Sequence, residues 1–119
     1  IPKFNISLNG TLSLGENTAD NEGLKIAYKA YRHYISKQKN AGETETLDGF
    51  TPDQMFFLGA SSLWCRKNAE FTVVIGLTDE HSPAEYRVNQ VFLNAPEFAS
   101  AFHCSPSSKM NPKTRCSIW

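Results

Sequence analysis

The sequence lacks a net charge, internal repeats and any long apolar run. Its 119 residues carry 12 Lys and Arg and 12 Asp and Glu, a balance that argues against bulk electrostatic capture of nucleic acid or anionic membrane. No stretch approaches the roughly 18 consecutive apolar residues of a membrane-spanning helix. The first ten residues, IPKFNISLNG, lack the charged and then apolar form of a signal peptide. If the protein is exported, we expect its targeting segment to lie outside this chain.

Cysteines are few and odd in number: Cys65, Cys104 and Cys116. Glycosylation sequons at Asn5 (N-I-S) and Asn9 (N-G-T) favour a secretory compartment, where three cysteines cannot all pair within one chain. Two cysteines twelve residues apart, Cys104 and Cys116, suggest a local disulfide. Cys65 is then either free or bonded to a partner outside this chain, and the chain is expected to be incomplete.

An apolar fraction of 40% is enough for one modest core, and recurring helix-start signals predict a mainly α fold. In each signal Ser, Thr or Asn precedes Glu or Gln by three residues. The four are 13–16 (SLGE), 51–54 (TPDQ), 82–85 (SPAE) and 94–97 (NAPE). Residues 71–75 (FTVVI) fit a strand or a helix equally well, and the tail after His103 is expected to be irregular.

Two carboxylates head the first expected helix. Glu16 and Asp20 are four residues apart and share a face, which continues through an apolar stripe of Leu24, Ala27, Tyr31 and Tyr34. Solvation near the positive end of the helix dipole is one explanation for the pair. The other is a metal site in which Glu16 binds the ion and Asp20 supports a neighbouring ligand. Spacing alone leaves both open.

His81 and Arg87 form a second candidate pair. His81 precedes the start signal at 82–85 and Arg87 follows it, so both side chains can face one cleft. A His that donates to a developing oxyanion, beside an Arg that holds a substrate carbonyl, is suited to acyl-group hydrolysis. Alternatively, Arg87 pairs with Asp79 or Glu80 and His81 is an ordinary loop residue.

Four motifs occur in the order typical of one family. They are 15–21 (GENTADN), 78–83 (TDEHSP) with 86–88 (YRV), 98–104 (FASAFHC) and 110–119 (MNPKTRCSIW). Together they closely resemble the C-terminal end of the neprilysin and endothelin-converting-enzyme family of zinc endopeptidases. The resemblance implies that residues 1–119 are the C-terminal helical part of a thermolysin-like (gluzincin) catalytic domain with an irregular, disulfide-pinned tail.

The resemblance also implies roles for the candidate residues. Glu16 would be the third zinc ligand, and Asp20 would accept a hydrogen bond from a zinc-binding His. His81 would stabilise the tetrahedral oxyanion, and Arg87 would hold a substrate backbone carbonyl. Glu80 stands where the family usually has Val, and we expect this carboxylate to raise the pKa of His81.

Other implied features concern the substrate pocket and the covalent cross-links. Leu63 and Trp64 would border a hydrophobic pocket for the residue after the cleaved bond. All three cysteines would pair with partners upstream of this chain, which replaces the local pairing suggested by spacing.

The H-E-x-x-H motif of the family does not occur here, where the histidines are His33, His81 and His103. Catalytic zinc needs about three protein ligands, so this chain alone is expected to be inactive. The intact protein is expected to be a zinc metalloendopeptidase that cuts oligopeptides before hydrophobic residues. The remainder of the catalytic domain would be its partner, and an N-terminal anchor outside this chain its only membrane contact.

Such enzymes act outside the cell, either secreted or as type II membrane ectodomains, which agrees with the two sequons. A different interpretation of the same sequence is a non-catalytic extracellular binding module or antigen fragment.

Overall fold

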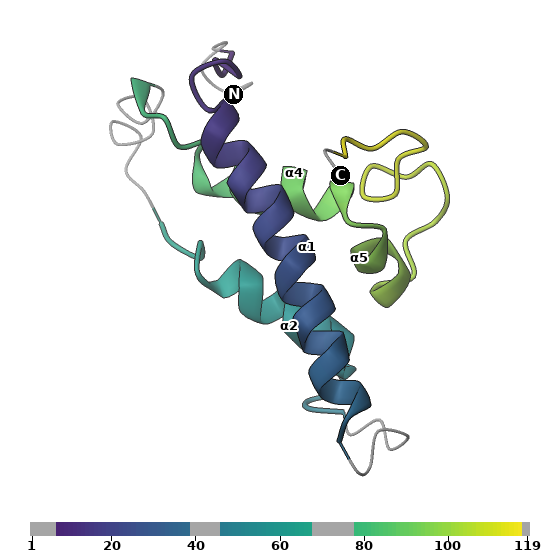
Figure 1. Ribbon diagram of the computed structural model, residues 1–119. Helices are drawn as coiled ribbons and strands as arrows, with labels where there is room; N and C mark the ends of the chain where they lie inside the picture. The colour runs from purple at the N-terminus through teal and green to yellow at the C-terminus, as the bar shows by residue number, and fades with distance from the viewer. Residues whose placement is uncertain (1–6, 39–45, 68–77, 118–119) are drawn as a thin grey trace.

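The described part of the computed structural model comprises residues 7–38, 46–67 and 78–117, and it contains four α-helices and no strand. The helices are α1 (Leu14–Ser36), α2 (Pro52–Ser62), α4 (Ala84–Asn94) and α5 (Pro96–Ala101). In Figure 1, α1 is the long diagonal rod, α4 lies beside its N-terminal half and α2 beside its C-terminal half. The mainly α prediction is confirmed. The ambiguous segment 71–75 lies outside the described residues. Among the residues that are described, no helix is long and apolar enough to cross a membrane.

One of the four predicted capping boxes forms. The Thr51 side chain accepts a hydrogen bond from the Gln54 amide at 3.3 Å, and the Gln54 side chain accepts one from the Thr51 amide at 2.9 Å. Pro52 occupies the first turn, where its missing N–H costs nothing. These contacts fix the start of α2.

The other three helices begin near the predicted residues but without a side-chain cap. The predicted capping boxes at 13–16, 82–85 and 94–97 are therefore wrong. Ser82 and Asn94 instead direct their side chains to α1, where they bond Asn17 and Asn21. A bond between helices has replaced the local cap that the sequence pattern predicted.

Aromatic rings form the centre of the core. Phe57 of α2 is 1% exposed and meets Phe92 of α4 and Phe98 of α5 edge to face, with ring centroids 5.4 and 5.3 Å apart. Tyr28 of α1 stacks on Phe57 at 5.5 Å, and Tyr31 stacks on Phe56 at 5.1 Å. Edge-to-face and stacked pairs add to the free energy gained by burial, so one cluster joins all four helices.

The buried face of α1 differs from the predicted stripe. Leu24 and Tyr28 pack against the core, whereas Ala27 and Tyr34 are exposed, so the prediction for these two residues is wrong. Toward the N-terminus the same face continues through Asn21 and Asn17 at helical spacing. The two carboxylates lie at the edge of this face rather than at its head.

Truncation of Phe57 should remove the centre of the aromatic cluster. We expect Phe57→Ala to lower the free energy of unfolding by about 3–5 kcal/mol, measured by chemical denaturation of the 119-residue chain. Ile26→Ala is the control, because Ile26 is an exposed apolar residue of α1. A loss in Phe57→Ala as small as that in Ile26→Ala would contradict the central place of Phe57.

Candidate functional site

Four candidate residues from two distant segments meet at the N-terminal part of α1. Glu16 and Asp20 come from α1, His81 from the loop before α4, and Arg87 from α4 itself. Trp64, just after α2, lies against the same cluster. The helical register places Glu16 and Asp20 one turn apart, and the packing of α4 on α1 brings the other two side chains within contact distance.

The tightest contact in the cluster joins Arg87 to Asp20. Nε of Arg87 donates to Oδ2 of Asp20 at 2.5 Å, and Nη2 donates to Oδ1 at 2.6 Å. The Arg87 and Asp20 side chains are only 11% and 16% exposed. A bidentate, charge-assisted pair of this kind is among the strongest polar contacts in proteins, and it raises the pKa of Arg87.

Two further groups hold the Arg87 guanidinium. Its central carbon lies 4.1 Å from the ring centroid of Trp64, a cation–π contact, and Nη2 lies 3.7 Å from Oε2 of Glu16. The partners of Arg87 are therefore Asp20, Glu16 and Trp64, rather than the loop carboxylates considered from the sequence. Among the described residues these contacts occupy Nε and Nη2, which leaves Nη1 for a ligand.

His81 lies between two carboxylates. Its Nε2 is 3.2 Å from Oε2 of Glu16 and its Nδ1 is 2.8 Å from Oδ1 of Asp79. The same Asp79 oxygen also accepts from the His81 backbone amide at 2.9 Å. Because both ring nitrogens face an acceptor, the doubly protonated imidazolium fits this arrangement best.

The hydrogen bond with Asp79 is the main reason that the pKa of His81 is raised, and the charge of Glu16 adds to it. The pKa of Asp79 is lowered, first by the hydrogen bond from the His81 backbone amide and second by the bond with the His81 ring. The predicted direction of the His81 shift is confirmed, but its assignment to Glu80 is wrong. The chain turns so that the Asp79 carboxylate, two residues before His81, contacts the ring. The adjacent Glu80 is not among the groups that shift the pKa of His81.

Leu63 and Trp64 border the same open groove as Asp20 and Arg87, between α1 and α2. Leu63 is 79% exposed, so its apolar side chain is open to solvent. Both residues of the predicted hydrophobic pair therefore lie beside the charged cluster, and one of them presents its apolar surface outward.

The remaining sequence candidates lie away from this cluster. Cys65, Cys104 and Cys116 are all free thiols, so the local disulfide suggested by spacing is absent, and Cys65 and Cys116 are exposed. Their pairing with partners elsewhere stays a prediction. The Asn9 sequon is exposed on the turn before α1, and Asn5 lies outside the described residues.

No group of three His, Cys, Asp or Glu residues in the described ranges is arranged to hold a metal ion. Glu16 nevertheless fits a contribution to such a site. Its side chain is partly exposed beside the imidazole and guanidinium, and a carboxylate oxygen is a common zinc ligand. Among the described residues, Glu16 is therefore a candidate for one ligand of a metal site rather than part of a complete one.

Sequence reasoning missed several residues that hold the site together. Asn17 and Asn21 of α1 bond Ser82 and Asn94 at the two ends of the α4 segment, and Asp79 holds His81. The spacing of Asn17 and Asn21, which continues the face of Leu24, was a signal available in the sequence. It indicated polar residues on a contact face, which require hydrogen-bond partners.

Removal of the Asp79 charge should lower the pKa of His81, because the carboxylate stabilises the protonated ring. We expect Asp79→Asn to show this shift in an NMR titration of the chain, with the pairing energy present at low pH and lost as pH rises through the raised pKa. Glu80→Gln is the matched control and should leave the pKa of His81 unchanged. A larger shift in Glu80→Gln than in Asp79→Asn would refute the assignment.

The whole chain has relatives in one peptidase family. Residues 2–118 match the model of Peptidase family M13. The sequence is 46% identical to Neprilysin-1 of Caenorhabditis elegans over 118 residues, which cover 96% of this chain and 15% of that protein. It is 44% identical to human neprilysin over 115 residues and 43% identical to human endothelin-converting enzyme 1 over 113 residues. Each of these two alignments covers 94% of this chain.

The fold has a counterpart in a solved structure of the Haemonchus galactose containing glycoprotein complex. The two chains superpose with a TM-score of 0.85 at 39% identity, over 94% of this chain and 20% of that one. This chain spans about 15% of the length of the relatives named above. The family resemblance expected from the motifs is confirmed, and the chain belongs to Peptidase family M13.

Proposed function

We propose that this chain is the C-terminal part of the catalytic domain of a zinc metalloendopeptidase. The observation that carries the proposal is the convergence of Glu16, Asp20, His81 and Arg87 into one cluster, although 60 or more residues separate the two acids from the other pair. Membership of Peptidase family M13 supports a metallopeptidase of the endopeptidase type. The cluster supplies one candidate zinc ligand and side chains suited to binding a peptide carbonyl and its oxyanion.

Glu16 is the residue proposed to bind zinc, together with two histidines from an upstream H-E-x-x-H motif. Zinc bound by three protein ligands keeps an open position, at which it acts as a Lewis acid and activates a water molecule. With one ligand of its own, the chain alone is inactive in this proposal. Its partner in the active site is the remainder of the same catalytic domain.

His81 is proposed to stabilise the oxyanion that forms when a peptide carbonyl is attacked. Asp79 fixes the ring through Nδ1 and raises the pKa of the imidazole, and in the protonated ring Nε2 carries a proton as well. If the Glu16 carboxylate were bound to zinc, this N–H would be free to donate to the substrate. A preorganised donor aimed at developing negative charge is an effective way to lower a reaction barrier.

Arg87 is proposed to hold a substrate backbone carbonyl through Nη1, because Asp20 and Trp64 lock the rest of the guanidinium. The same Asp20 carboxylate is proposed to accept a hydrogen bond from a zinc-binding His. A carboxylate has about four acceptor positions, of which Arg87 uses two. One acid can therefore orient both the substrate-binding residue and a metal ligand.

The substrates proposed are oligopeptides cut before hydrophobic residues. The exposed Leu63 and the adjacent Trp64 give the groove beside Arg87 an apolar border, and contact with such a border favours an apolar side chain. We further propose an extracellular or cell-surface location, secreted or as a type II ectodomain. The sequons at Asn5 and Asn9 fit this location, and disulfides from the three cysteines to upstream partners would fit it as well.

Glu16→Ala in the full-length protein should abolish zinc binding. We expect loss of metal, measured by atomic absorption, and a fall in peptide hydrolysis of more than about 100-fold, since even residues that only support a ligand cost 10- to 100-fold. The matched control is Glu85→Ala, which removes an exposed first-turn Glu from α4. Retention of both zinc and turnover in Glu16→Ala would rule out Glu16 as a zinc ligand. If the full-length sequence lacks H-E-x-x-H, the alternative of a non-catalytic binding module is favoured.

Arg87→Ala should weaken substrate engagement while zinc stays bound. We expect kcat/KM to fall about 10- to 100-fold, the equivalent of one hydrogen bond to a charged group. Arg87→Lys should recover little of this loss, because a lysine cannot form the bidentate contact with Asp20. Loss of zinc from Arg87→Ala would instead assign Arg87 to the metal site.

A further inference from the structure

A chain of side-chain hydrogen bonds runs along the interface between α1 and the α4 segment. Asn17 donates through Nδ2 to the Ser13 hydroxyl at 2.9 Å and accepts through Oδ1 from the Ser82 hydroxyl at 2.7 Å. One turn further along α1, Asn21 donates through Nδ2 to the backbone carbonyl oxygen of Asn17 at 2.7 Å and accepts through Oδ1 from Asn94 at 2.9 Å.

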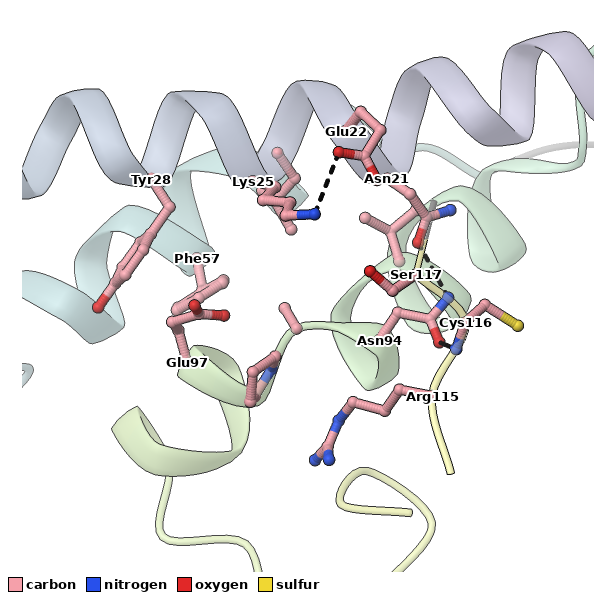
Figure 2. Close-up of a pocket in the computed structure, with 14 residues that line it drawn as sticks. Asn21, Glu22, Lys25, Tyr28, Phe57, Asn94, Glu97, Arg115, Cys116 and Ser117 are labelled. Carbon is pink, nitrogen blue, oxygen red and sulfur yellow. Dashed lines mark hydrogen bonds and ion pairs between the residues drawn. The ribbon is translucent and has the colours of Figure 1, made fainter. Parts of the chain in front are cut away.

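The chain of bonds continues into the tail. Figure 2 shows Asn94 between Asn21 and Cys116, with a dashed line to each. The Cys116 amide donates to Asn94 at 3.1 Å. Two bridges of similar chemistry therefore link α1 to the α4 segment, one at each end of that segment.

We propose that Ser82 and Asn17 are a positioning pair that sets His81 against Glu16; this inference rests on the proposed function. The bond between them joins the residue after His81 to the residue after Glu16. A contact of 2.7 Å at this place fixes the separation of the two backbone segments. The 3.2 Å contact between His81 and Glu16 follows from it.

The contacts of His81 itself are too exposed to do this alone. The His81 side chain is 42% exposed and the Asp79 side chain 54%, and exposed ion pairs contribute little because water and salt screen them. The loop at 78–83 contains no α-helix or strand. The Ser82 hydroxyl is therefore the part-buried link between this loop and α1.

Asn17 is itself well fixed. Both the nitrogen and the oxygen of its side-chain amide form hydrogen bonds. The Ser13 hydroxyl, which accepts from the nitrogen, donates to the backbone carbonyl of Asn9 at 3.3 Å. Ser13 is 5% exposed, so water competes little for these bonds. This arrangement holds the amide in one orientation, with its oxygen toward Ser82.

The Ser82 hydroxyl bonds to α1 and does not cap the start of α4. Ser82 stands one residue before the N-cap of α4, Pro83, and no side chain caps that helix. Ser commonly satisfies amides at a helix start, but here its hydroxyl donates across the interface. The Ser82 hydroxyl therefore contributes to the contact between the loop that carries His81 and α1.

Ser82→Ala in the full-length protein should lower kcat at least tenfold, because a small displacement of a group that acts in the transition state is costly. We expect KM and zinc content to stay within twofold of the wild type. Ser82→Thr, which keeps the hydroxyl, should recover most of the loss. Asn94→Ala is the matched control, since it breaks the bridge farther from Glu16 and should lower the melting temperature with little effect on kcat.

Two results would overturn the proposal: an unchanged kcat in Ser82→Ala, or an equal fall of kcat in Asn94→Ala. If the wild-type protein hydrolyses no peptide, the proposed function fails and position is measured directly in the 119-residue chain. Nuclear Overhauser contacts between the His81 ring and the Glu16 side chain should then appear in the wild type, Ser82→Thr and Asn94→Ala, and vanish in Ser82→Ala. Their persistence in Ser82→Ala also overturns the positioning role.

Discussion

The bidentate pair of Asp20 and Arg87 is the contact on which the arrangement of the site depends. It joins α1 to α4 across 67 residues of sequence, with both side chains largely removed from water. Loss of one partner from such a pair leaves a desolvated charge and typically costs about 3–5 kcal/mol. The position of the guanidinium against Trp64 and beside Glu16 is therefore a consequence of this pair.

The aromatic core makes that pair possible. Phe57 contacts rings from the other three helices, so the separation and angle of α1 and α4 are set by close-packed apolar surfaces. The polar bridges then occupy the part of the interface nearer the N-terminus of α1. Burial supplies most of the stability, whereas the hydrogen bonds select one register between the two helices.

Local chemistry could be predicted from the sequence, and contacts between elements could not. The Thr51 box depends on residues three apart and forms as predicted. Ser82 and Asn94 carry the same local signal, but their side chains form hydrogen bonds with α1 instead of capping a helix. Similarly, the candidate site residues were identified by motif, whereas the contact of His81 with Asp79 in place of Glu80 depends on a turn that spacing does not specify. The contact face of α1 differs from the predicted apolar stripe because it includes two polar residues, Asn17 and Asn21, which form hydrogen bonds across the interface.

The bare start of α4 has an electrostatic consequence. Because no side chain caps this helix, its first amide groups keep their partial positive charge, equivalent to about half an elementary charge at the end of the macrodipole. That helix begins three residues after His81. The positive end of the α4 dipole therefore lies close to His81 along the chain, and its partial charge, unlike the charge of the imidazole, does not depend on pH.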